Sequence, residues 1–473
     1  MNPTTKERFE ALVAYTRNPL AAGITSKELE WYASDNETLL ATIIVDVDNE
    51  FTAIILGRDT DLKYHCINFP RMFEKIEDAR NYMFSESKRL LDEENFTTQN
   101  NNKKSLFDII CDKKSINPHF EMLRSSKEYS SAKAIIEEIM PHFKDITDKN
   151  FIKDFQSINF DSRLWELYLF SYLTEEKLVI ERENDAPDFL VSRGIKKVAI
   201  EAVTVNTTQG NKDIENFTPE KIAELLKNEI PLKFGSSLTS KLNKTNKKGE
   251  HYWEMEHTKN RPFILAIADF HEKGSMMWSS KALEHYLYGT RQDWHVSNDG
   301  QLIITPVEKS FVKGNGAEIK GFFSLENSEN ISAVLFSASG TISKFIRMGK
   351  MAGFGDSSVG VKYGGNCYDH SHSLKPNRFF FEVDTNYKES WGTGISIFHN
   401  PNARYPLSKD IFPSVVHHYM DKNGQLNSYL PAFQFFPFSG FTVMHSVTEN
   451  ITQDIFESMI TTFSTVTGDR IAR

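Results

Sequence analysis

Cysteine is scarce in this chain of 473 residues, which has only Cys66, Cys111 and Cys367, far apart in the sequence. An odd and scattered set excludes a disulfide framework and a paired-cysteine zinc site, and it favours a reducing compartment such as the cytoplasm. The chain also lacks an apolar run of about 18 residues, so we expect no transmembrane helix and no membrane partner. Its first residues lack the apolar core of a signal peptide. These absences together predict a cytoplasmic protein.

The sequence has no Gly-x-x-x-x-Gly-Lys-Ser/Thr loop, which argues against ATP hydrolysis by a P-loop. It also has no excess of positive charge, since 55 Lys and Arg residues face 64 Asp and Glu residues, for a net charge of −9. This balance excludes a surface coated in phosphate-binding lysines, although it allows a local basic groove. The composition is 40% hydrophobic and 25% charged, as in ordinary globular proteins, and the length allows two or three domains.

Hydrophobic patterning divides the chain into four parts. The first combines helical and extended patterns and ends in a polar stretch typical of a linker. The third alternates helices with strands, and its most apolar strands suit the centre of a mixed sheet flanked by helices. The fourth is rich in aromatic residues, proline and glycine, and predicts loops, short strands and a final helix. The expected parts are an α+β module (1–98), a helical connector (105–150), an α/β domain (151–365) and a C-terminal region packed on that domain (366–473, with its helix at 454–463).

Three acidic residues of the third part stand in apolar surroundings. Glu166 lies in a helical pattern that is apolar nearly all round, Asp188 follows Pro187 at the start of a strand, and Glu201 lies inside an apolar strand. Carboxylates are seldom buried unless they are paired or bind a cation. An ion pair with Arg163 would also account for Glu166, a turn would account for Asp188, and a salt bridge for Glu201. Taken together, the three predict a site for a divalent metal.

The order of these residues resembles that of the PD-(D/E)XK nuclease superfamily, whose fold is restriction-endonuclease-like. There a helix supplies a glutamate, a strand supplies the aspartate, and the next strand carries an acidic residue, any residue, and then lysine. The resemblance covers about residues 151–270, and it departs from the pattern at Val203, where the lysine should stand. Some members supply this lysine from the following helix. The resemblance therefore implies Lys241 in this role, with Lys244 in reserve.

The resemblance further implies a Mg²⁺- or Mn²⁺-dependent endonuclease. Asp188 and Glu201 would bind the metal, Glu166 would complete the shell, and the backbone carbonyl of Ala202 would add a ligand. Such a metal activates a water and offsets charge on the scissile phosphate, and the lysine would orient that water. The expected catalytic residues are thus Glu166, Asp188, Glu201 and Lys241.

A basic stretch with aromatic residues follows this site in the sequence and predicts contacts to nucleic acid. We favour DNA as the substrate, with RNA left open, because no base-reading element is visible. By analogy, a nuclease with accessory modules suits a bacterial genome-defence effector, which acts as a homodimer or with a partner protein that supplies the trigger. The expected nucleic-acid-binding residues are Lys233, Lys244, Lys247, Lys248, Tyr252 and Trp253.

Two alternatives stay open. Val203 favours a catalytically inactive nuclease fold that serves as a nucleic-acid-binding or scaffold module. Ser337 and Ser339 follow an apolar strand, as the nucleophile of a serine hydrolase would, although the Gly-x-Ser-x-Gly spacing is missing.

Overall fold

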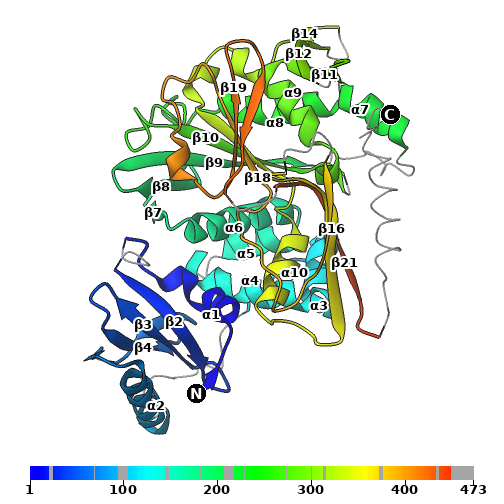
Figure 1. Ribbon diagram of the computed structural model, residues 1–473. Coiled ribbons are helices and arrows are strands. Elements are labelled where there is room, and N and C mark those ends of the chain that lie inside the picture. Colours follow the sequence, from blue (N-terminus) through cyan, green and yellow to red (C-terminus); the bar gives the residue numbers. More distant parts are fainter. Residues whose placement is uncertain are drawn as a thin grey trace.

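Two β-sheets organise the protein in the computed structural model, a six-stranded sheet near the N-terminus and an eight-stranded central sheet (Figure 1). The final helix expected at 454–463 lies outside the described residues. The structure describes residues 1–20, 25–68, 70–93, 105–143, 149–181, 183–184, 186–206, 218–227, 229–272, 274–299, 301–312, 316–371, 376–432 and 436–448. No helix among these ranges is long and apolar enough to cross a membrane.

The N-terminal sheet has a small core of its own beneath one long helix, α2. The sequence predicts extended runs at 39–47 and 51–56, a strand at 64–68 and a helix at about 74–93. The structure confirms these within a few residues, and β2 was not foreseen. The elements are β1 (Asn2–Pro3), α1 (Lys6–Val13), β2 (Ser26–Ala33), β3 (Leu39–Asp46), β4 (Phe51–Arg58), β5 (Tyr64–Cys66), β6 (Met72–Phe73) and α2 (Ile76–Glu93).

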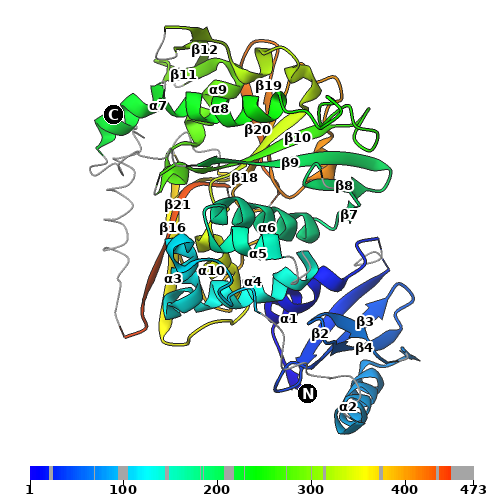
Figure 2. The same cartoon turned by 180° about the vertical axis from the view of Figure 1, so that it is seen from behind.

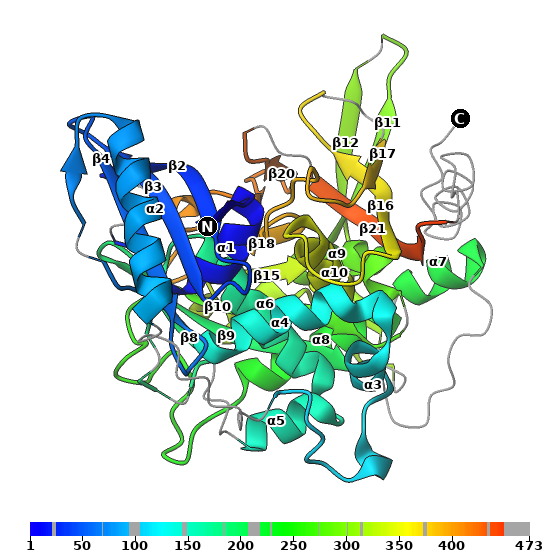
Figure 3. The ribbon, with the colours of Figure 1, turned by 90° about the horizontal axis from the view of Figure 1, so that it is seen from below.

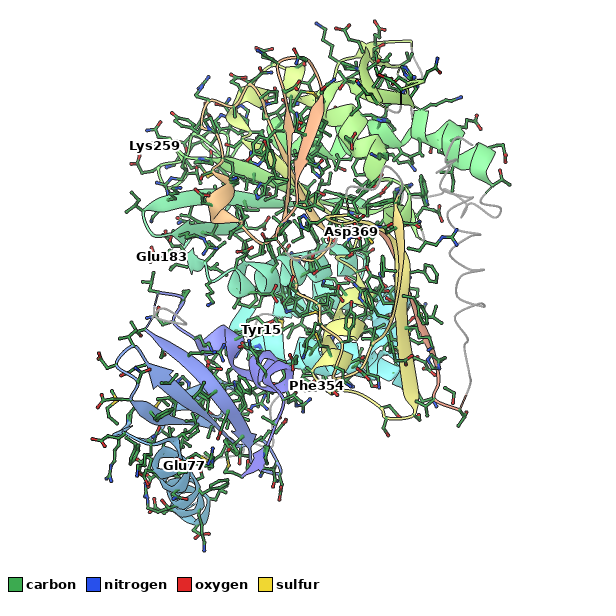
Figure 4. The ribbon with its side chains drawn as sticks, in the orientation of Figure 1. Tyr15, Glu77, Glu183, Lys259, Phe354 and Asp369 are labelled. Atoms are coloured by element: carbon green, nitrogen blue, oxygen red, sulfur yellow. The ribbon has the colours of Figure 1, made fainter. Side chains whose placement is uncertain are left out.

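This module joins the rest of the molecule through α1 and the segment that follows it. The ring of Tyr15 stacks on His142 and Phe170, with centroids 5.6 and 5.5 Å away, and the Arg8 guanidinium lies 3.6 Å above the centre of the Phe354 ring. Figure 4 labels Tyr15 and Phe354 at this junction. The contact fixes the module against the layer of helices that follows it in the chain.

The central sheet has the order β20-β19-β18-β15-β10-β9-β8-β7. Strands β7, β8 and β9 form an antiparallel meander, β9, β10 and β15 run parallel, and β18 returns antiparallel to β15. The sheet is therefore mixed, as expected. Strands β11–β12 and β13–β14 form two small sheets apart from it. The elements of this part of the chain up to β15 are α6 (Phe160–Glu175), β7 (Val179–Glu181), β8 (Phe189–Arg193), β9 (Lys196–Asn206), α7 (Pro219–Lys227), α8 (Glu229–Leu242), β10 (Phe263–Phe270), α9 (Ser280–Tyr288), β11 (Thr290–Val296), β12 (Leu302–Glu308), β13 (Phe311–Val312), β14 (Glu318–Ile319) and β15 (Ala333–Ser337).

Helices cover both faces of this sheet, as Figure 2 shows from behind. Alternate residues of the strands enter two separate cores, so that Ile264 faces the layer of α6 and Leu265 faces the layer of α8. Strand β10 is buried on both sides, which confirms the expectation drawn from its continuous apolar run. The residues expected to form a helical connector belong to the first of these layers, as α3 (Pro118–Ser125) and α4 (Ser130–Phe143), and α5 (Lys149–Gln156) lies with them.

The C-terminal region is more than a covering layer, because three of its strands extend the central sheet. Without β18, β15 would present an open edge. The expectation of only short strands was wrong: β21 has eleven residues and pairs along β16, and the two stand together at one side of the molecule (Figure 3). The elements are α10 (Ile342–Met351), β16 (Val359–Tyr368), β17 (Asn377–Glu382), β18 (Ile395–His399), β19 (Val416–Met420), β20 (Leu426–Tyr429) and β21 (Phe436–Ser446).

A fully buried charge cluster anchors α10. The Glu389 carboxylate accepts from the Lys344 ammonium at 2.6 Å and from the Arg347 guanidinium at 2.8 Å, and all three side chains are at most 2% exposed. Close packing of α10 on α4 also requires Gly349, because a Cβ there would lie 2.2 Å from the carbonyl oxygen of Ser131.

Candidate active site

The start of β8 brings two of the predicted acids together. Phe189 pairs with Ile200, so the antiparallel register sets Asp188 opposite Glu201. Strand β9 continues beyond this point without β8 beside it, and the Ala202 N–H on its open edge donates to Asp188 Oδ2 at 2.7 Å. A strand residue directs its N–H and C=O to the same side, so the Ala202 carbonyl also faces this edge. The edge thus gathers two carboxylates and a backbone carbonyl.

Glu201 is buried, with 4% of its surface exposed, and it meets the lysine that the sequence singled out. Lys241 Nζ lies 2.5 Å from Glu201 Oε1. Helix α8 holds the lysine there because Leu238 and Leu242, on either side of it, are buried against the sheet. Val203 lies on the same face of β9 and is itself buried among the side chains of α8. A helix lysine therefore occupies the surroundings that a lysine at 203 would have occupied.

Glu166 reaches the same pocket from α6, but the structure gives it a partner of its own. The Arg163 guanidinium donates to both of its carboxylate oxygens at 2.8 and 3.0 Å, and it also bonds Asp154 at 2.6 Å. The ion pair that would account for a buried Glu166 is thus observed, and its part in a metal shell stays a prediction. A helix places residues three apart on one face, so Arg163 can meet Glu166 without tertiary help.

One pocket of about 590 Å³ is lined by all four predicted catalytic residues. Asp188 is exposed to this pocket and is surrounded by protein on its other sides. This desolvation acts together with the negative charges of Glu201 and Glu166 to raise the pKa of Asp188 from 3.8 to about 7, although the Ala202 N–H and Lys241 oppose the rise. Negative charge therefore remains in excess around Asp188 even with two cations nearby.

This surplus is the property that a cation site needs. No group of three or more His, Cys, Asp or Glu residues in the described ranges is arranged as a ready metal site. Mg²⁺, however, is commonly held by one or two carboxylates, with water and substrate phosphate completing its shell. Asp188, Glu201 and the Ala202 carbonyl supply hard oxygen donors of that kind, so the residues present fit Mg²⁺ or Mn²⁺.

The residues expected to bind nucleic acid divide into three groups. Lys244 lines the pocket, with its ammonium 5.3 Å from the centre of the Tyr252 ring, while Lys247 and Lys248 are exposed on the loop after α8. Lys233 lies one turn after Glu229 and pairs with it at 3.4 Å. The last group comprises the two aromatic residues.

Tyr252 is buried, which contradicts the predicted stacking of its ring on bases, whereas Trp253 is half-buried and its stacking on bases stays a prediction. Tyr252 is only 4% exposed, and its ring stacks on Phe263, a neighbour of Glu201 on the sheet. Burial and the nearby Glu201 carboxylate raise the pKa of the Tyr252 phenol, which therefore stays protonated at the pocket wall. Trp253 stacks on His251 at 4.7 Å and packs edge-on against Phe263. The packing of both rings therefore holds the loop after α8 in place.

Sequence reasoning missed the polar wall that α8 presents to the pocket. Its serine hydroxyls alternate with the lysines at spacings of one helical turn, which is a pattern readable in the sequence. The residues concerned are Ser236, Ser237 and Ser240, and from the other elements Asn159, Ser162 and Thr204.

For the serine alternative, the hydrogen bonds of Ser337 within the described ranges include no catalytic base. Ser337 is fully buried, and its hydroxyl contacts the Tyr168 hydroxyl at 3.1 Å and accepts from the Ser339 N–H at 3.1 Å. Neither contact is a general base of the kind that a serine nucleophile requires.

Comparison with family models, with curated proteins and with solved structures finds no match for this chain.

Proposed function

We propose that the protein is a divalent-metal-dependent nuclease that hydrolyses phosphodiester bonds, with DNA as the favoured substrate. The observation that carries the proposal is the contact between Lys241 Nζ and Glu201 Oε1 at 2.5 Å, beside Asp188 in a single pocket. A lysine next to metal-binding acids is what phosphodiester hydrolysis needs, because charge builds up on the attacking water and on the phosphate in the transition state.

The succession of elements supports a restriction-endonuclease-like core. Helix α6 carries Glu166, Asp188 precedes β8, Glu201 lies on β9, and the next helices lead to β10, which runs parallel to β9. This is the order of acids on which the resemblance to the PD-(D/E)XK superfamily rests. Lys241 on α8 supports the variant of that pattern in which a helix supplies the lysine.

Each residue then has a distinct task. Asp188 and Glu201 would hold the metal, with the Ala202 carbonyl as a further ligand; when bound, Mg²⁺ lowers the pKa of a water and offsets phosphate charge. Lys241 orients the attacking water and stabilises the phosphate as negative charge develops on it. Glu166 lies at the same pocket and would hold a water of the metal shell once Arg163 releases it.

The pocket wall also supports a polynucleotide substrate. Lys244 lines the pocket, and Lys247 and Lys248 continue the positive charge along the loop beyond it. These side chains suit contacts to phosphates, which position a strand without reading its sequence. The role in bacterial genome defence, with a homodimer or a partner protein as the trigger, belongs to the same proposal.

The test is cleavage of supercoiled plasmid, single-stranded DNA and RNA by the full chain with Mg²⁺ or Mn²⁺. The wild type is compared with Asp188→Ala and Glu201→Gln. Glu181→Gln is the matched control, because Glu181 also pairs with a lysine at 2.5 Å but does not line the pocket. We expect cleavage by the wild type and the control, and loss of at least 100-fold in the two site variants.

Equal cleavage by all four proteins would contradict the proposal. Binding without cleavage by any of them would instead favour the alternative that Val203 motivates, a nuclease fold that only binds nucleic acid. The plasmid, single-stranded and RNA substrates decide between DNA and RNA within the same experiment.

A further inference from the structure

Two cations already occupy the acidic site. Lys241 Nζ lies 2.5 Å from Glu201, and the Arg163 guanidinium lies 2.8 Å from Glu166. The third acid, Asp188, accepts a hydrogen bond from the Ala202 N–H at 2.7 Å. Two of the three acids of the pocket, Glu201 and Glu166, are thus each paired with a basic side chain of the same chain.

A divalent ion cannot enter this arrangement without changing it. The Lys241 ammonium takes one of the Glu201 oxygens that a metal would use, and its positive charge repels a nearby cation. The Arg163 guanidinium holds both oxygens of Glu166 in the same way. Metal binding therefore competes with both ion pairs.

Both basic side chains can turn from their acidic partners towards the pocket. The Lys241 and Arg163 side chains are 25% and 30% exposed and line the open pocket, where a bound phosphate would lie. The Arg163 guanidinium also donates to Asp154 on α5, so Arg163 keeps one ion pair when it leaves Glu166. A guanidinium can meet a phosphate, as it meets a carboxylate, with two parallel N–H groups.

We infer that Lys241 and Arg163 are internal counter-ions that keep the metal affinity of the free protein low, and that a nucleic-acid strand raises this affinity by drawing them to its phosphates. This inference rests on the proposed function and adds its regulation: metal and strand each promote binding of the other. Coupling between two ligands is reciprocal, so the metal must strengthen strand binding by the same factor. Such coupling would keep the free protein inactive at the metal concentrations under which it cuts.

The test measures Mn²⁺ binding to the full chain by electron paramagnetic resonance, with and without a phosphorothioate oligonucleotide that resists cleavage. Lys241→Met is expected to bind Mn²⁺ about 10-fold tighter than the wild type without oligonucleotide, since it removes the competitor and its charge. The oligonucleotide should tighten Mn²⁺ binding about 10-fold in the wild type and far less in Lys241→Met.

Lys197→Met is the matched control. Lys197 lies on β9 four residues before Glu201, and it pairs with Glu181 at the same 2.5 Å distance outside the pocket. It should leave Mn²⁺ affinity and coupling unchanged. Asp188→Asn removes a proposed ligand, so a loss of Mn²⁺ binding in this variant locates the metal at the site. With the oligonucleotide added, the same variant measures the Mn²⁺ that the oligonucleotide binds by itself.

The outcomes separate the two proposals. If Asp188→Asn binds Mn²⁺ like the wild type, the metal site itself is wrong and the proposed function fails. If Asp188→Asn loses Mn²⁺ but Lys241→Met binds it no tighter than the wild type, the counter-ion inference alone is overturned. Thermal unfolding checks that each variant is folded, and Lys241→Gln and Arg163→Met carry the same expectation if Lys241→Met does not fold.

Discussion

Replacing Asp188 by asparagine is expected to stabilise the protein when no divalent metal is present. The raised pKa of Asp188 means that its charged form is less favourable in the folded chain than in the unfolded one. At about 1.4 kcal/mol for each pH unit that the pKa moves, the rise from 3.8 to about 7 limits this penalty to about 4 kcal/mol. Solvent in the pocket screens the charge, so we expect a gain of about 1 kcal/mol from Asp188→Asn.

The sign of the pH dependence follows from the raised pKa. At pH 4 the Asp188 carboxyl is protonated in the folded chain and about half protonated in the unfolded one, so the substitution should change the stability little. The penalty grows as the pH rises and is complete above pH 7. In a chain of this size, 1 kcal/mol corresponds to a gain in Tm of about 1–2 °C. Differential scanning calorimetry in EDTA at pH 8 and at pH 4 measures the difference in Tm between Asp188→Asn and the wild type.

Divalent metal should reverse the order of stability. Mg²⁺ at about 100 times its dissociation constant adds about 2.7 kcal/mol to a protein that binds it only when folded. Asp188→Asn loses a ligand and should gain little. The variant is then more stable than the wild type in EDTA and less stable in saturating Mg²⁺. A lower Tm in EDTA, or an equal response of both proteins to Mg²⁺, would refute the reasoning.

Four other outcomes are expected. Cleavage should rise about 10-fold for each pH unit up to about pH 7 and then level off, because the metal requires the ionised form of Asp188; a flat profile between pH 5 and 8 would contradict this. Lys241→Ala should lower the cleavage rate about 100-fold while Mn²⁺ still binds, which single-turnover assays and metal titration measure separately. Glu389→Gln should cost about 3–5 kcal/mol in urea unfolding, because it leaves two buried cations without their counter-ion. A serine-reactive phosphonate should not label Ser337, and labelling seen by mass spectrometry would revive the hydrolase alternative.

Local patterns in the sequence were sufficient for much of the fold. The extended runs at 39–47 and 51–56, with a turn between them, and the continuous apolar run from Phe263 to Ala268 predicted strands that the structure contains. The strands after residue 366 were underestimated because glycine and proline weaken the pattern. Pairing of β21 along β16 supplies the hydrogen bonds that hold a strand with so little local preference.

The candidate site divides in the same way. That Asp188 and Glu201 lie side by side could be anticipated, since the register of two neighbouring strands is a local property of a short segment, and the resemblance implied Lys241. The partner of Glu166 was readable too, because Arg163 stands one helical turn away. The position of the Tyr252 ring could not be read from the sequence, because nothing near Tyr252 in the chain shows that its ring packs on Phe263.

The order of residues alone was enough to locate the three acids, several of the strands, and the absence of a lysine at position 203. Only the tertiary structure decided how the charges are shared, since that depends on which side chains meet across elements distant in the chain. It brings Lys241 to Glu201 from 40 residues away, and it leaves Asp188 with the surplus negative charge. The physical reason is that electrostatic energy depends on distance and burial, which the order of residues alone does not specify.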